Sequence, residues 1–323
     1  RTPDGDASQV VPNLSAGLAL VLAVIMVLVI IAYVDHTAQS LQATHLIGDV
    51  TQGTVALVAK RFPNVGEAES EDQPPPPSAP AAGGHRVSAP RSGWLQQVSE
   101  ADLLGALPPG GLLRVELRVG SFVHAGRRLC TVWLNDLCDD SVLEALDEEI
   151  HEAFVIGRAR TMQQDVDFGI RQLADVALRA LSTGVNDATT AYECIVHLGE
   201  VLYEILRRDL PPAVRHGDDG RCVLRPHEPT HDDYVGRAFD QIRRNAAPMP
   251  DLCLALVRTL GSLAVELDDL GLGDRVAALA RQARLVLAGA TAEDPLPEDL
   301  DLVRQAVLDA GFGPLPPAGP VAS

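Results

Sequence analysis

The chain has 323 residues, of which 46% are hydrophobic and 22% are charged, and its 44 acidic and 26 basic side chains give a formal net charge of −18. This apolar content excludes a largely disordered chain, and the acidic balance argues against nucleic acid or anionic lipid as a partner. The five cysteines are scattered without a C-x-x-C pair, so the sequence favours neither a disulfide scaffold nor a structural zinc site.

The first predicted element is a membrane-spanning helix. The segment Leu14 to Val34 has 21 residues, of which Ser15 and Tyr33 are polar, and residues 7–34 contain no charge. At ~1.5 Å rise per residue, this segment crosses a hydrocarbon layer of ~30 Å. A signal peptide would need a basic start and a small-residue cleavage site, which the sequence lacks. An amphipathic period continues to about Phe62, so we predict a transmembrane helix and stalk over residues 7–62.

Small residues recur along one face of this span, at Ser15, Ala19 and Ala23. Such spacing allows two helices to approach closely, and it favours a homo-oligomer, although alanine is also common throughout this chain. The chain begins at Arg1 and has a single span, so we expect preceding spans to be missing from it or to come from partner subunits. Lys60 and Arg61 close the stalk and favour a cytoplasmic soluble part at the inner cell membrane.

A proline-rich linker and a small β unit are predicted next. Residues 63–91 include four consecutive prolines, which is typical of an extended linker. Residues 92–135 alternate between apolar and polar side chains, with turn glycines at Gly120 and Gly126, and therefore predict a small β unit. This pattern resembles half of a lipoyl- or biotinyl-type barrel. Such domains carry their cofactor on a lysine, and Lys60 is the one lysine of the chain, so we expect no cofactor here.

Residues 139–312 have helical periodicity and predict an all-helical soluble domain. The whole chain is therefore expected to be an α+β membrane protein: a transmembrane helix continuing into a stalk, a small β unit, and a helical C-terminal domain. Capping residues, prolines and glycines mark the helix ends. The predicted helices are 141–157, 161–181, 187–208, 231–245, 251–270, 274–287 and about 297–310.

The densest candidate region begins at residue 161. An apolar face there lies opposite a ladder of Asp167, Arg171, Asp175 and Arg179, spaced four residues apart. Such a ladder is either a solvated row of ion pairs or a polar face that contacts a ligand or partner.

A polar turn follows this predicted helix. We expect Gly184 to take the left-handed position that ends the helix and Asp187 to cap the next one. Ser182, Asn186 and Thr190 converge there, so the turn is a candidate site for a neutral polar ligand, a cation or a partner subunit.

The run from Asp165 to Ala191 resembles the signature of a bacterial family of predicted membrane proteins called domain of unknown function 2254. The matching residues include Asp165, Phe168-Gly169, Arg171, Asp175, Arg179, Ser182, Gly184, Asn186, Asp187 and Thr190, whereas Thr183 and Ala188 stand where the family usually has proline. The resemblance implies several amino-terminal spans and carries no established activity. It also adds Asp165 to the candidate residues.

His227, His231 and the upstream Cys222 lie in a loop-like pattern that lacks a second pair of metal ligands, so no metal site is expected. We favour a non-enzymatic membrane protein whose soluble domain mediates subunit assembly or senses a small ligand. One alternative is a channel or transporter subunit. The other is a membrane-tethered enzyme that uses the Ser182–Asp187 turn.

Overall fold

The computed structural model describes residues 13–67, 83–135 and 139–313. The chain divides into two compact units, Arg1–Leu46 and Ile47–Ser323, which are described separately. Helix α1, Asn13–Arg61, contributes residues to both units. Residues 7–12, with which the predicted span and stalk begin, lie outside the described residues.

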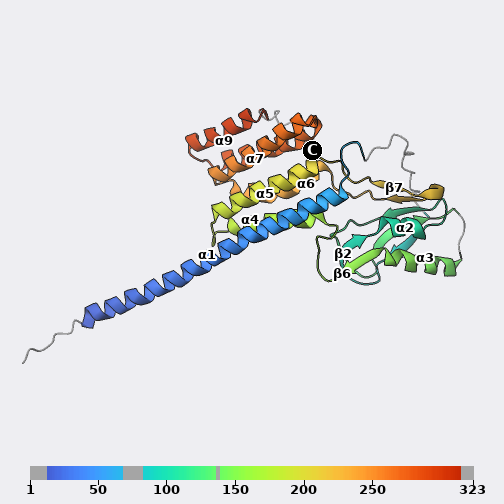
Figure 1. Ribbon diagram of the computed structural model, residues 1–323, viewed down its shortest axis with the longest axis horizontal. Helices are drawn as coiled ribbons and strands as arrows, with labels where there is room; N and C mark the ends of the chain where they lie inside the picture. The colour runs from blue at the N-terminus through green and yellow to red at the C-terminus, as the bar shows by residue number, and fades with distance from the viewer. Residues whose placement is uncertain (1–12, 68–82, 136–138, 314–323) are drawn as a thin grey trace, which may run out of the picture. The chain divides into compact units, whose positions relative to one another are not determined.

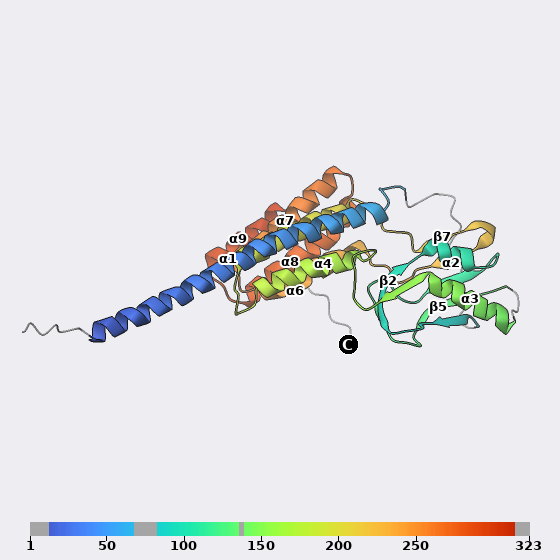
Figure 2. The same ribbon diagram turned by 60° about the horizontal axis from the view of Figure 1, so that its bottom comes forward.

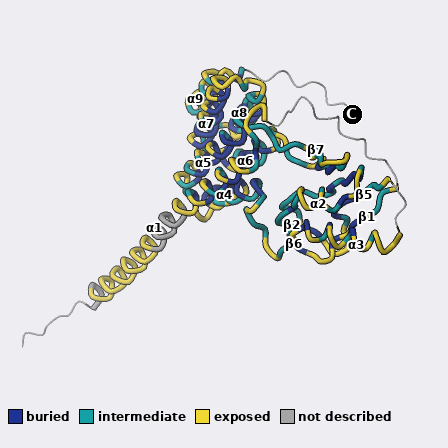
Figure 3. Tube along the Cα trace, turned by 45° about the vertical axis from the view of Figure 1, so that its right-hand side comes forward, coloured by how far each residue is buried: buried dark blue, intermediate teal, exposed yellow. Residues whose placement is uncertain are grey.

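The first unit contains the apolar part of α1. Residues Ala16–Val34 form the one helical stretch, among the described residues, that is long and apolar enough to cross a membrane. Side chains such as Leu18, Ile25 and Ile31 are exposed along it (Figure 3). Ala19 and Ala23 are exposed as well, and the Ser15 side chain lies outside the described part. Because protein does not cover these apolar groups, hydrocarbon is the solvent that suits them.

The second unit contains a helical bundle, shown together with the end of α1 in Figures 1 and 2. One apolar core joins the bundle helices to α1, with Ile47 and Val58 of α1 buried alongside Leu198 and Phe239. The residues 47–62 predicted to be a stalk are therefore part of the bundle. The other helices are α4 (Val166–Ala180), α5 (Ala188–Leu206), α6 (His231–Ala246), α7 (Pro250–Asp269), α8 (Val276–Ala292) and α9 (Pro297–Asp309).

The β part of the second unit has a separate apolar core. A five-stranded sheet has the order β1-β5-β3-β8-β7, and a three-stranded sheet has the order β4-β2-β6. All pairings are antiparallel except that of β3 with β8. The strands are β1 (His85–Ser88), β2 (Gly93–Val98), β3 (Leu112–Val115), β4 (Phe122–Val123), β5 (Arg128–Trp133), β6 (Phe154–Gly157), β7 (Val214–His216) and β8 (Cys222–Leu224), and the helices are α2 (Glu100–Ala106) and α3 (Asp140–Glu152).

Three sequence expectations need correction. Strand β1 lies inside the segment predicted as a linker, because its pairing with β5 supplies hydrogen bonds that its own pattern does not reveal. A helix is predicted over residues 141–157, but the observed helix ends at Glu152. Residues Phe154–Gly157 form strand β6, which pairs with β2. The helix predicted from residue 161 begins at Val166, where Asp165 supplies the cap.

The segment between α5 and α6 returns to the β part. Residues 139–312 are predicted to be all-helical, but this segment has two strands, β7 and β8. Val223 of β8 is fully buried in the β core and pairs with Leu113 of β3. After β6, the chain therefore passes between the β part and the bundle three times: from β6 to α4, from α5 to β7 and from β8 to α6. The residues at these crossings build the candidate site.

Candidate functional site

Asp165 anchors the crossing from the β part into α4. Its carboxylate caps the helix by accepting a hydrogen bond from the Phe168 backbone N–H at 3.1 Å. The residue is 3% exposed and forms a two-point ion pair with Arg160, with Nε 2.6 Å from Oδ2 and Nη2 3.1 Å from Oδ1. A buried carboxylate needs such a partner, because removing an unpaired charge from water is costly.

Asp167 is the second residue of α4, and its carboxylate accepts hydrogen bonds from two arginines and forms an ion pair with a third. Arg160 Nη2 is 2.9 Å from Oδ2, and Arg237 Nη1 of α6 is 3.1 Å from Oδ1. Arg118, in the turn that follows β3, places Nη2 3.7 Å from Oδ2. We call Arg118, Arg160, Asp167 and Arg237 the Asp167 cluster. It joins the β part, the crossing segment and two bundle helices around one carboxylate.

Aromatic rings and a glycine hold Arg160 and Asp165 in place. The Arg160 guanidinium lies 5.2 Å from the Phe168 ring centroid and 6.0 Å from that of Trp94. Gly120 has a φ of +85°, and a Cβ there would overlap the Asp165 carboxylate. Glycine at this turn therefore provides both a left-handed backbone and the close approach of the β part to α4.

An open cavity of about 730 Å³ lies beside the Asp167 cluster. Six arginines and four aspartates line it, so the lining has two more positive than negative charges, although the whole chain carries −18. The capping hydrogen bond from the Thr230 N–H lowers the pKa of Asp233, which keeps this lining carboxylate ionised. The lining residues are Trp94, Arg118, Arg160, Asp167, Ile170, Arg171, Asp232, Asp233, Gly236, Arg237, Asp240, Gln241, Arg244 and Arg281.

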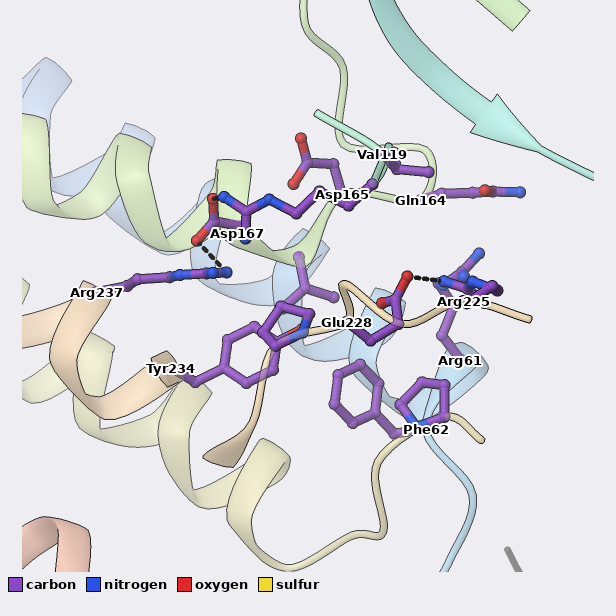
Figure 4. A pocket seen from close by; sticks show the side chains of 14 residues that line it. Arg61, Phe62, Val119, Gln164, Asp165, Asp167, Arg225, Glu228, Tyr234 and Arg237 are labelled. Carbon is purple, nitrogen blue, oxygen red and sulfur yellow. Dashed lines mark hydrogen bonds and ion pairs between the residues drawn. The ribbon is translucent and has the colours of Figure 1, made fainter. Parts of the chain in front are cut away.

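A second cavity, of about 40 Å³, connects the other side of the cluster to the end of α1 (Figure 4). Phe62 of α1 packs on Tyr234 of α6 with ring centroids 5.9 Å apart. Burial raises the pKa of Tyr234, so its phenol stays neutral. Arg225 is 8% exposed and pairs with Glu100 and Glu228.

Arg61 lies at the end of α1 and also lines this second cavity. Burial, together with the neighbouring Arg225 charge, lowers the pKa of Arg61. Two guanidinium groups, those of Arg61 and Arg225, therefore lie close together at the end of α1, and the carboxylates of Glu100 and Glu228 compensate their charge.

The predicted ladder on α4 is confirmed at one step. Arg171 Nε is 2.8 Å from Asp175 Oδ1, and both side chains are about half exposed. Asp167 turns instead to Arg160 and Arg237, because these guanidinium groups from other elements reach its carboxylate. Arg179 is exposed, and no ion pair with Asp175 forms within the described residues.

The polar turn between α4 and α5 satisfies its own capping needs. Ser182 Oγ donates to the Arg179 carbonyl at 2.7 Å, and Asp187 accepts from Thr190 N at 3.1 Å and from Thr190 Oγ1 at 2.6 Å. The expectation of a left-handed Gly184 is wrong, because Asn186 has that conformation, with a φ of 49°. Asparagine adopts the left-handed conformation more readily than most residues, because its short side-chain amide can form hydrogen bonds with the nearby backbone.

The sequence candidates therefore fall at two ends of one helix. Asp165 caps the first turn of α4, and the Ser182–Asp187 turn follows its last residue, Ala180. A helix of 15 residues separates them by about 22 Å at 1.5 Å per residue. The two groups cannot form one binding site. The helical spacing places Asp167 in the ladder, whereas its partners Arg118, Arg160 and Arg237 come from other segments and carry no signal in the sequence.

Two of the residues considered for metal binding lie in secondary-structure elements. His231 begins α6, and its Nε2 lies 3.1 Å from the Arg208 carbonyl, while Cys222 is buried in β8. Within residues 13–67, 83–135 and 139–313, no group of three or more His, Cys, Asp or Glu side chains is arranged to hold a metal ion.

Fold and site together define an α+β protein with one candidate membrane-spanning helix and a charged cavity in its second unit. The chain belongs to the family described as predicted membrane protein, domain of unknown function 2254, whose model matches residues 1–262. This membership confirms the resemblance carried by the α4 signature.

Curated relatives are similar in sequence to this chain over most of its length. It is 30% identical over 290 residues to the uncharacterized protein Rv1290c of Mycobacterium tuberculosis and, to the same extent, to the uncharacterized protein Mb1321c of Mycobacterium bovis. The alignment covers 89% of this chain and 54% of each relative, so the chain spans about half the length of the curated relatives it matches. No solved structure matches it significantly.

Proposed function

We propose that this chain is a membrane-anchored ligand sensor, with the cavity beside the Asp167 cluster as its binding site. The observation that carries the proposal is the composition of that cavity. Its walls come from the β part, through Trp94 and Arg118, and from the bundle, through α4, α6 and α8. A ligand bound between two parts of a protein stabilises one arrangement of those parts over others.

The contacts between the β part and the bundle support such a response. Each part has its own apolar core, and the two cores share no residue. Ion pairs bridge the two parts, for example that of Arg118 in the β part with Asp167 of α4. Polar junctions of this kind permit relative movement more readily than a continuous apolar core does.

A short path leads from the cavity to the helix that continues from the membrane. Arg237 and Tyr234 lie three residues apart on α6, and their side chains contact one another through the ring of Tyr234, 5.8 Å from the guanidinium carbon. Tyr234 in turn packs on Phe62, which directly follows α1. A change in the Asp167 cluster therefore reaches the end of α1 through two contacts.

Hydrogen exchange of the full chain in lipid nanodiscs tests this coupling without a ligand. Asp167→Asn removes the charge that three guanidinium groups share. We expect exchange to become about tenfold faster both at residues 116–121 of the β part and at residues 58–62, as the loss of roughly 1.5 kcal/mol of pairing would produce. Asp175→Asn, on the same helix but in an exposed pair, is the control. Faster exchange confined to α4 would overturn the proposal.

Subunit assembly is the second function that we propose, because apolar side chains line one outer face of α5. Tyr192 and Val196, one turn apart, are 52% and 44% exposed, and Val185 precedes them in the turn. Exposed apolar groups in a row favour a contact with another protein surface. Native mass spectrometry of the full chain in detergent should show an oligomer that Tyr192→Ser with Val196→Ser weakens. A monomer for the unaltered chain would exclude assembly.

We also propose that the soluble unit faces the cytoplasm at the inner membrane. Lys60 and Arg61, the first lysine and arginine after the span ends at Val34, support this orientation, since basic residues that follow a span tend to be retained on the cytoplasmic side. A protease added to intact spheroplasts should leave the soluble unit uncut, whereas digestion would reverse the assignment.

A further inference from the structure

The second cavity, of about 40 Å³, lies where the end of α1, the start of α6 and the β part meet. A water molecule inside a protein needs about 10–15 Å³ of such space and two to four polar partners, so this cavity has room for about three water molecules. Four arginines and three carboxylates line it, together with Gln164 and Tyr234. Apolar cavities of this size stay dry, whereas polar walls such as these favour water.

Tyr234 brings to this cavity a hydroxyl without a protein partner. The residue is 5% exposed, and within the described part of the chain no hydrogen bond joins its hydroxyl to another residue. Because burial raises the pKa of Tyr234, the hydroxyl stays protonated and can both donate and accept a hydrogen bond. A buried hydroxyl with no partner costs free energy, so a partner inside the cavity would stabilise the fold.

Arg61 and Glu228 line the same cavity from other segments (Figure 4). Besides burial, the Glu228 carboxylate affects the pKa of Tyr234 and, with other charges, that of Arg61, so the three side chains lie within electrostatic range of one another. Among the described residues, no direct hydrogen bond joins any two of them. Glu228 pairs with Arg225 through Oε1, which leaves Oε2 available. Polar groups that are near one another without a direct bond are commonly bridged by water.

We infer that the second cavity is a hydration site, in which ordered water bridges the Tyr234 hydroxyl to Arg61 and Glu228. An anion there would meet the Glu228 carboxylate, and a cation would meet the Arg61 guanidinium. Water suits both, because it accepts from one and donates to the other. The bridge connects the last residue of α1 to α6. This inference goes beyond the sensor function and requires no ligand in the larger cavity.

Removal of the hydroxyl tests the inference by the sign of its effect. Tyr234→Phe keeps the ring that packs on Phe62. If water bonds the hydroxyl, the equilibrium constant for unfolding of the full chain in detergent should rise about fivefold. A hydroxyl without a partner predicts the opposite sign, because its removal relieves a desolvation cost. Tyr192→Phe, at a residue that is 52% exposed, is the control and should change the constant less than about twofold. An unchanged or lowered constant for Tyr234→Phe would overturn the inference.

A double-mutant cycle tests the bridge itself. Arg61→Met keeps an unbranched side chain but removes the guanidinium, so the water loses one of its partners. In that background Tyr234→Phe should raise the unfolding constant only about twofold, because the two effects share the same water. Arg304→Met on α9, outside the cavity lining, should leave the fivefold effect unchanged. Equal effects of Tyr234→Phe with Arg61 and with Met at that position would refute a bridge to Arg61.

Two further measurements identify the occupant. The Tyr234→Phe comparison is repeated with sodium gluconate in place of sodium chloride, and the effect should be the same in both salts. An effect seen in chloride alone would assign the cavity to a small anion and overturn the water site. In crystals of the full chain that show ordered water, density should lie about 2.8 Å from Tyr234 Oη. A dry cavity, or a protein group at that position, would also overturn the inference.

Discussion

Thr54 of α1 packs directly against Gly169 of α4, so closely that a Cβ at residue 169 would overlap the Thr54 hydroxyl. Thr54 is fully buried, and its Oγ1 donates to the Val50 carbonyl at 2.6 Å, which removes the need for a partner on α4. Within the second unit, α4 thus packs on the later turns of α1 by a helix crossing that only glycine permits on the α4 side.

Substitution of this glycine should loosen α1 from the bundle. Gly169→Ala gains helix propensity, but the overlap with Thr54 forces the two helices apart, and we expect a net loss of about 1–3 kcal/mol in the free energy of unfolding. Denaturant titration of the full chain in detergent measures it. Thr54→Ala in the same chain should recover part of the loss. Gly48→Ala, on α1 with open space around its Cβ, should instead stabilise by up to ~1 kcal/mol.

Asp165→Asn separates the charge of this residue from its capping role. Asparagine still accepts the hydrogen bond that begins α4, but it leaves Arg160 with one carboxylate in place of two. Because Asp165 is buried, we expect a loss of about 2 kcal/mol, and about 1 kcal/mol more for Asp165→Ala. Asp175→Asn, in an exposed pair, should cost under ~0.5 kcal/mol in the same unfolding measurement. Equal losses at residues 165 and 175 would contradict the buried pair.

His231 should make the second unit sensitive to mild acid. Burial, with the Arg275 charge next to it, lowers the pKa of His231 below its ordinary value of 6.5. The unfolded chain therefore takes up the proton first as the pH falls, so the contribution of this residue to stability is complete above pH 6.5 and declines as the pH falls through the folded pKa.

Unfolding measured from pH 7.5 to pH 5 tests this contribution. The stability difference between the unaltered chain and His231→Gln should shrink as the solution is acidified, since glutamine keeps an N–H for the Arg208 carbonyl without titrating. His124→Gln, at an exposed position, is the matched control. A constant difference across this range would show that His231 titrates alike in both states.

The apolar span should hold the full chain in the bilayer. We expect the chain to remain in the membrane pellet after a sodium carbonate wash, because residues Ala16–Val34 have an apolar surface that the protein leaves exposed. Ile25→Arg places a charge near the middle of the span at a cost of about 3 kcal/mol and should shift part of the chain to the supernatant. Ile25→Leu controls for the substitution itself. Release of the unaltered chain would contradict a membrane-spanning α1.

Local signals in the sequence determined most of the helices. The apolar run that forms the span, the bundle helices and the cap at Asp187 follow from side chains within one or two turns of each other. These features depend on hydrophobic periodicity and on hydrogen bonds between residues close in sequence, so they can be predicted from the sequence alone. The prediction at Gly184 failed because either glycine or asparagine can take the left-handed turn position.

Only the tertiary structure decided the site. Asp167 has the spacing of a helix ion pair with Arg171, yet it pairs with Arg237, 70 residues later, because folding brings α6 alongside α4. Likewise, β1 and β8 become strands through pairing with β5 and β3, which are distant in sequence. A charged side chain or a strand can pair with many different partners that are distant in sequence. Which partner it pairs with therefore depends on which segments the apolar cores bring together.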